Sequence, residues 1–256
     1  GADSFGSTDA DTGEWKINTS PSVSYGTVGF WILKDGNTVT DSSPNSNDHT
    51  VSNGTLTSTI DNPSNNYCTW NILHAQTGGI SEIGNGSTFL ATQNDNTWRT
   101  AYGSLAFKGT GKFYCEFKCG NLGNYQSIGI IDIDQQAPNN SNFANESRAY
   151  AYRKTGVKEN TGSGSSYGDS WTSLDFLQLA YNNGAIWFGK NGTWQNSATL
   201  SEISAGTTTY AAFTGIDTSK LYTIAWEGYS DDMIELNAGN GYFRVTDLGG
   251  SSTVYN

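Results

Sequence analysis

Two aspartates in the segment IIDIDQQ have a spacing that could serve glycoside hydrolysis. Asp132 and Asp134 are two residues apart in an expected strand, so their side chains share one face. A retaining glycosidase needs two carboxyl groups about 5 to 5.5 Å apart, and same-face neighbours on a strand come near that separation. The segment lacks the glutamates of a Glu-x-Asp-x-Glu catalytic strand. We therefore favour turn or strand-end roles for both aspartates.

Other catalytic or metal-binding chemistry has little support. The only histidines, His49 and His74, lie in polar, loop-like segments, whereas a Ser-His-Asp system needs a positioned histidine. Neither has a second ligand-type residue at metal-site spacing. The Asp- and Asn-rich stretch 35–59 lacks the pattern of a calcium loop with a terminal glutamate ligand, so a solvated loop is favoured there. We expect no catalytic residue, no metal and no cofactor.

The three cysteines allow at most one disulfide. Cys115 and Cys119 lie four residues apart in one expected strand, which places them roughly 13 Å from each other, too far to be bridged. Cys68 remains open to pairing with either one. The favoured interpretation is that all three are small core residues.

Recognition by aromatic side chains is the chemistry that remains. Rings on loops stack on sugars or anchor protein partners, and a nearby carboxylate accepts hydrogen bonds from ligand hydroxyls. Mid-strand aromatics such as Trp187 are expected to pack instead. The candidate ligand-binding residues are Trp98, Tyr125, Tyr167, Asp169, Trp171 and Trp194.

The elements that would position these residues are short strands separated by Gly, Asn, Ser and Asp. No convincing amphipathic helix is found. In KFYCEFKC, Phe113 to Cys119 alternate between an apolar face and a face with Tyr114, Glu116 and Lys118, which predicts a half-buried antiparallel strand. Regular short strands with turn signals favour a sandwich or barrel. The expected strands are 27–34, 87–93, 103–109, 111–119, 126–133, 147–153, 174–182, 185–190, 208–214, 222–229 and 241–246.

Two Asn-Gly pairs give the most specific local signal. Both central residues of a type I′ turn need positive φ, which Asn-Gly adopts at low cost. Asn183-Gly184 would join 174–182 to 185–190, and Asn191-Gly192 would join 185–190 to the residues after it. The sequence therefore predicts a three-stranded meander.

The text around these turns resembles a known family. LQLAYNNGAIWFGKNGTWQNS resembles the G-x-[IL]-W-F-x-K-N-G-x-W core of SPRY domains, and GTGKFYCEFKC resembles their GKWYWEV-type strand. Structural proteins of tailed phages and marine viruses that carry SPRY-like domains contain segments similar to DNPSNNYCTWNIL, DADTGEWK and SVSYGTVGFWI of this chain. The resemblance covers roughly residues 60–246. LQLAYNNG departs from the family's ALDLDNG pattern, and Cys115 stands where many relatives have an aromatic, so no binding site is carried over.

The resemblance implies an all-β, antiparallel SPRY-like β-sandwich of concanavalin or jelly-roll type. We expect it at residues 26–256, after a polar N-terminal arm or linker at residues 1–25. The net charge of −11 in 256 residues argues against a nucleic-acid partner, and no apolar run approaches the roughly 20 residues of a membrane span.

The leading functional hypothesis is a non-enzymatic virion structural protein, on a tail fibre or capsid exterior, that attaches to a host-surface glycan or protein. Many copies would make weak sites useful. Its partners would be other virion proteins and its own copies, as a homo-oligomer on the virion surface. The first alternative is a purely architectural decoration or fibre domain, because polar arms often order only on an assembly partner. The second alternative is a concanavalin-like glycosidase.

Overall fold

The computed structural model of the protein describes residues 2–10, 13, 15–18, 20–32, 38–52, 67–73, 79–121, 123, 125–135 and 141–239. The chain divides into two compact units, one of residues 1–67 with 239–241 and 254–256, and one of residues 68–238 with 242–253. The predicted boundary after residue 25 falls inside the first unit and stays a prediction. The strand expected at 241–246 and His74 lie outside the described residues.

The first unit contains a short hairpin and loops held by side-chain hydrogen bonds. Its elements are η1 (Ala2–Ser4) and the antiparallel strands β1 (Gly6–Thr8) and β2 (Trp15–Ile17). The apolar run 27–32 is turn and irregular structure, not the expected strand. Side chains compete there for the backbone: the Trp31 N–H donates to Asp41 at 2.8 Å, and Asn47 Nδ2 donates to the Gly29 carbonyl at 3.0 Å.

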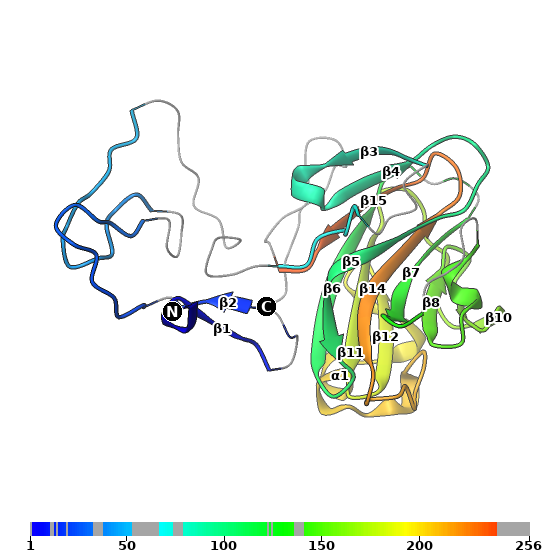
Figure 1. The fold of residues 1–256 in the computed structure, drawn as a ribbon. Helices are drawn as coiled ribbons and strands as arrows, with labels where there is room; N and C mark the ends of the chain where they lie inside the picture. The colour runs from blue at the N-terminus through cyan, green and yellow to red at the C-terminus, as the bar shows by residue number, and fades with distance from the viewer. Residues whose placement is uncertain are drawn as a thin grey trace. The chain divides into compact units, whose positions relative to one another are not determined.

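The second unit is a sandwich of two antiparallel β-sheets (Figure 1). The six-stranded sheet has the order β10-β9-β8-β7-β14-β5, and the seven-stranded sheet has the order β13-β12-β11-β6-β15-β4-β3. Every strand pair in both sheets is antiparallel in the described residues. The strands are β3 (Ile80–Gly84), β4 (Phe89–Thr92), β5 (Arg99–Lys108), β6 (Lys112–Cys119), β7 (Gln126–Asp132), β8 (Ala149–Arg153), β9 (Val157–Asn160), β10 (Ser163–Ser166), β11 (Phe176–Asn182), β12 (Ala185–Lys190), β13 (Thr193–Trp194), β14 (Leu221–Gly228) and β15 (Met233–Asn237).

Alternate residues of the strands fill the core between the sheets, as the period of two predicts. On β6, Cys115, Phe117 and Cys119 face this core, while Glu116 and Lys118 lie on the opposite face. That opposite face is also buried at these two residues, which are 4% and 0% exposed. The three cysteines are free thiols, so no disulfide joins them.

Both Asn-Gly turns form where the sequence predicts them. Asn183 and Asn191 have φ angles of 44° and 51°, and the glycines after them also have positive φ. The turns connect β11 to β12 and β12 to β13 in direct register. Trp187, in the middle of β12, is 0% exposed and packs as expected. The meander prediction is confirmed, although β13 is only two residues long.

Helical turns appear where none was expected. Residues 208–214 make one turn of helix and a single bridge from Phe213 to Ile186 instead of a strand. The α-helix has a capping box between Thr199 and Glu202 and ends at Gly206, with φ at 75°. At under two turns it carries too little periodicity to be recognised. These elements are η2 (Asn85–Ser87), η3 (Phe143–Asn145), η4 (Gln195–Ser197), α1 (Leu200–Ala205) and η5 (Thr208–Tyr210).

A buried carboxylate lies on the outer face of the six-stranded sheet. Glu227 on β14 is 0% exposed, and one of its oxygens accepts the backbone N–H of Phe143 at 2.8 Å. Phe143 packs over this face beside Tyr102, Ile131 and alanines of β8 and β14. Burial raises the pKa of the Glu227 carboxyl to about 8, although hydrogen bonds and the nearby Arg153 partly oppose this. Among the described residues no helix has the length and apolar character to cross a membrane.

Candidate functional site

Three aromatic rings meet at one end of the sandwich because neighbouring strands begin or end there in register. In the six-stranded sheet β14 lies between β7 and β5, and its last residue, Gly228, pairs with the first residues of both strands. The next residue outward on each strand is aromatic: Trp98 before β5, Tyr125 before β7 and Tyr229 after β14. We call these three residues the aromatic cluster.

The rings of the aromatic cluster touch one another and stay partly open to solvent. Ring centroids are 5.6 Å apart for Trp98 and Tyr125, 5.1 Å for Trp98 and Tyr229, and 5.6 Å for Tyr125 and Tyr229. The interplanar angles of 44° to 88° are typical of edge-to-face packing. Tyr125 is 46% exposed, and the other two are half-buried. Within the described part of the chain, the indole N–H and both hydroxyls have no hydrogen-bond partner.

A buried aspartate holds the three loops of the cluster together. The carboxylate of Asp232 accepts the N–H of Gly123, in the loop of Tyr125, and the N–H of Tyr229 at 2.6 Å. Its backbone exchanges two 2.9 Å hydrogen bonds with Thr92, at the start of the loop that carries Trp98. Asp232 is 0% exposed, and burial raises the pKa of its carboxyl. The cluster is thus pre-organised before any ligand arrives.

The rim of the cluster exposes carboxylates and turns its basic groups inward. Arg99 is 8% exposed and pairs with Asp95 at 2.6 Å. Lys154 Nζ donates to the Gly123 carbonyl. Asp231 is exposed, and its carboxylate accepts a hydrogen bond from Asn121 at 2.7 Å. No basic side chain pairs with Asp231 among the described residues.

The structure brings two of the predicted recognition residues together and adds one. Trp98 and Tyr125 are 27 residues apart in the chain yet share a ring contact. Tyr229 was missed because it ends the expected strand 222–229, where aromatics were expected to pack. Its position at the boundary between strand and turn is the signal that could have indicated a loop residue.

Two predicted residues lie in the core and do not present their rings to a ligand. Tyr167 is 8% exposed and packs edge-on against Tyr152 and Phe188, and burial raises the pKa of its hydroxyl to about 12. Trp171 is 1% exposed, and its indole N–H donates to the Arg153 carbonyl at 3.0 Å. Their polar, glycine-rich context suggested a surface loop, but both rings pack into the core between the sheets.

The last two predicted residues lie apart from the aromatic cluster. Trp194 is half-buried, with its ring 6.2 Å from that of Tyr114. Asp169 is exposed, and its backbone N–H donates to the Gln195 side chain at 2.7 Å. Neither contacts a residue of the cluster among the ring contacts and hydrogen bonds of the described residues.

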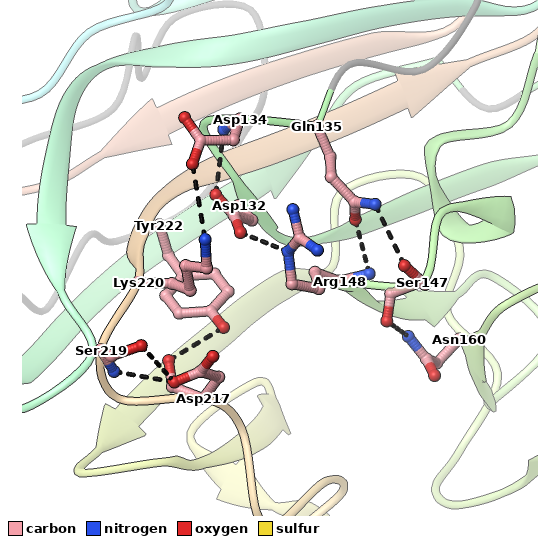
Figure 2. Close-up of polar contacts among 10 residues, drawn as sticks. All are labelled: Asp132, Asp134, Gln135, Ser147, Arg148, Asn160, Asp217, Ser219, Lys220 and Tyr222. Carbon is pink, nitrogen blue, oxygen red and sulfur yellow. Dashed lines mark hydrogen bonds and ion pairs between the residues drawn. The ribbon is translucent and has the colours of Figure 1, made fainter.

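The aspartate pair considered for hydrolysis has other partners (Figure 2). Asp132 is 0% exposed and pairs with Arg148, whose pKa this hydrogen bond raises. One Asp132 oxygen also accepts the Asp134 backbone N–H at 2.9 Å, and the Asp134 carboxylate turns toward Lys220 at 3.7 Å. A fully buried, ion-paired carboxylate cannot reach a glycoside, so Asp132 has a structural role.

A cavity of about 200 Å³ lies near this network, where β5 and β14 shift register. Gln135 belongs to both, because it lines the cavity and accepts the Arg148 N–H at 2.6 Å. Neither Asp132 nor Asp134 lines it.

The described residues contain no group of three or more His, Cys, Asp or Glu that could hold a metal ion.

Comparison with solved structures identifies the fold. The chain superposes on the SPRY domain of human HERC1 with a TM-score of 0.51 and 17% identity, covering 66% of this chain and 98% of that one. The fold is a SPRY-like β-sandwich. A second human SPRY domain matches with a TM-score of 0.48 and 15% identity, covering 63% of this chain and 98% of that domain. No protein-family model and no curated protein matches this chain. At this identity the likeness shows the fold of the SPRY-like sandwich and transfers no binding residue.

Proposed function

We propose that this protein is a non-enzymatic recognition module that binds its partner through the aromatic cluster. The observation that carries the proposal is the convergence of three half-exposed rings, from three loops, on one end of the sandwich. Tyrosine and tryptophan dominate binding hot spots because they bury a large rigid surface and keep a polar tip for hydrogen bonding. Within the described residues, the indole N–H of Trp98 and the hydroxyls of Tyr125 and Tyr229 have no hydrogen-bond partner.

The setting we propose is a virion exterior, as a tail-fibre or capsid module that contacts a glycan or protein of the host surface. This part rests on the resemblance of residues 61–73 and of the N-terminal segments DADTGEWK and SVSYGTVGFWI to viral structural proteins. Repeated copies on a particle would let a site as small as three rings give useful avidity. The acidic surface is consistent with protein or neutral glycan partners and opposes nucleic acid.

The test is binding of the multimerised full chain to a glycan array and to host-surface proteins. Tyr125→Ala removes an exposed ring without opening the core, so it should abolish binding while the melting temperature stays unchanged. Asp134→Asn is the matched control, because Asp134 follows the opposite end of β7. Binding that survives both Tyr125→Ala and Trp98→Ala would refute the proposal.

The architectural alternative is favoured by one observation, the burial of Tyr167 and Trp171. Because Trp194 and Asp169 also lie apart from the cluster, only Trp98 and Tyr125 of the six predicted residues belong to it. If neither array gives a partner and the native assembly covers the aromatic cluster with a neighbouring copy or virion protein, the architectural function replaces recognition.

A further inference from the structure

We propose that the ligand of the aromatic cluster is a polypeptide segment that presents an arginine or lysine side chain. This inference rests on the proposed recognition function and names the partner's chemistry. The geometry of the rings alone does not specify the charge of the ligand. The inference is therefore based on the distribution of charge around the three rings.

The charge that faces solvent beside the cluster is negative. Asp231 lies two residues after Tyr229, and its loop is joined to the loop of Trp98 through the 2.8 Å hydrogen bond from Ser230 Oγ to Asn94. The carboxylate has a neutral partner, Asn121, and no cationic one among the described residues. An incoming cation would therefore find an uncompensated charge at the edge of the rings.

The basic groups near the rings have partners other than Asp231. Arg99 is buried against Asp95, and Lys154 donates to a backbone carbonyl inside the loop of Tyr125. The chain as a whole carries 24 acidic and 13 basic residues. A sulfated, sialylated or phosphorylated ligand would meet repulsion here, while a cation would be attracted over a Debye length.

The rings supply the second half of a cation site. A guanidinium or ammonium group within about 6 Å of an aromatic face is attracted by the ring quadrupole, and arginine also stacks on the ring. Tyr125 is the most exposed of the three rings. It lies in the same connection between β6 and β7 as Asn121, whose side chain donates a hydrogen bond to Asp231. An arginine would stack on this ring while its N–H groups donate to Asp231.

Asp231 also offers a clean test of the charge. Its φ angle is 55°, in the left-handed region, where asparagine is the best tolerated residue after glycine. Asp231→Asn therefore removes the charge, keeps an oxygen acceptor for Asn121 and leaves the turn intact. Equal melting temperatures and near-ultraviolet dichroism of the variant and wild type would confirm that the fold is retained.

The experiment uses two bead-bound heptapeptide libraries that differ at one fixed central residue. One library carries arginine and the other citrulline, which has nearly the same shape and no charge. The labelled, multimerised full chain is applied in 50 mM and in 500 mM NaCl. We expect about two- to fivefold more binding to arginine beads at low salt, falling toward the citrulline level at high salt.

The variants connect the preference to the site. Tyr125→Ala should weaken binding to both libraries and reduce the arginine preference, and Asp231→Asn should reduce arginine binding toward the citrulline level without changing citrulline binding. Asp134→Asn, at the other end of β7, should behave as wild type. Equal binding to both libraries, or an arginine preference unchanged in Asp231→Asn, would overturn the inference.

A glycan array separates this inference from the proposed function. Neutral glycan binding that needs Tyr125, without any arginine preference, would overturn the basic ligand and leave the recognition function standing. If neither peptides nor glycans give Tyr125-dependent binding, both proposals fail.

Discussion

Replacement of Glu227 by glutamine should remove a large, measurable part of the loss of stability that occurs as the pH rises through neutrality. The Glu227 carboxyl has a folded-state pKa of about 8, against 4.5 when unperturbed, because it is buried under Phe143. Its contribution to stability is therefore complete below pH 4.5 and is lost as the pH rises through 8. Glutamine keeps an oxygen for the Phe143 N–H and cannot ionise.

The magnitude follows from the two pKa values. The difference between about 8 and 4.5, at 1.36 kcal/mol per pH unit, corresponds to about 5 kcal/mol. Linkage places about 4 kcal/mol of this loss between pH 5 and pH 9. Glu227 should therefore contribute a fall of that amount to the free energy of unfolding of the wild type over this range. Glu227→Gln should match the wild type near pH 5 and exceed its stability at pH 9.

Urea denaturation at five pH values from 5 to 9, followed by tryptophan fluorescence, measures the effect. Glu82→Gln is the matched control, since Glu82 is exposed on β3 and its replacement should shift both ends of the curve by less than about 0.5 kcal/mol. Parallel pH profiles for wild type and Glu227→Gln would show that Glu227 ionises without cost, and the burial argument would be wrong.

Three further outcomes are expected. In the folded protein only Cys68, which is partly exposed, should react promptly with a thiol reagent, because burial raises the pKa of the Cys115 and Cys119 thiols. Mass spectrometry of the labelled protein measures this, and equal labelling of all three cysteines would contradict it. Asp232→Ala should lower the free energy of unfolding, measured by urea denaturation, by about 2 kcal/mol, since two backbone N–H donors lose their acceptor. It should also weaken the near-ultraviolet dichroism of the aromatic cluster, and an unchanged spectrum would show that Asp232 does not organise the loops. Trp171→Phe should lower the free energy of unfolding by about 1 to 3 kcal/mol without altering partner binding, because the indole is buried and donates one hydrogen bond. Loss of binding in a variant of unchanged stability would show that Trp171 contacts the partner.

The strands could be predicted where local patterns are strong. The two Asn-Gly turns specify pairing with little outside help, and the structure confirms them. Alternation on β6 correctly predicted an antiparallel strand with Phe117 toward the core, but its other face is buried at Glu116 and Lys118, so the strand is not half-buried. The strands that escaped prediction are β1, β2, β3, β9, β10 and β15. Most of them are too short or too polar to show a hydrophobic period. In β15, Ile234 and Leu236 do alternate with polar residues, but the strand is only five residues long. Residues 27–32 show the reverse error, because loop side chains satisfy the backbone of an apolar run.

The candidate site could be predicted only in part. Trp98 and Tyr125 were named as loop aromatics from their polar surroundings, and this context indicates exposure correctly when the loop lies outside the core. The same context is misleading for Tyr167 and Trp171, whose rings belong to the core cluster. Composition records which residues flank a ring in sequence, whereas burial depends on which strands pass beneath it.

Local chemistry in the sequence therefore determined the short strands, the meander and the supply of surface aromatics, while the choice of a sandwich over a barrel came from the resemblance to SPRY domains. Alternation and turn preference act over a few residues, so they can be read without knowing the rest of the chain. Tertiary structure alone placed Trp98, Tyr125 and Tyr229 together, because their contact depends on the register of β5 and β7 against Gly228. It also buried Glu227 and Asp232, whose raised pKa values come from neighbours far away in sequence. Long-range pairing of strands brings such groups together, and no local pattern encodes it.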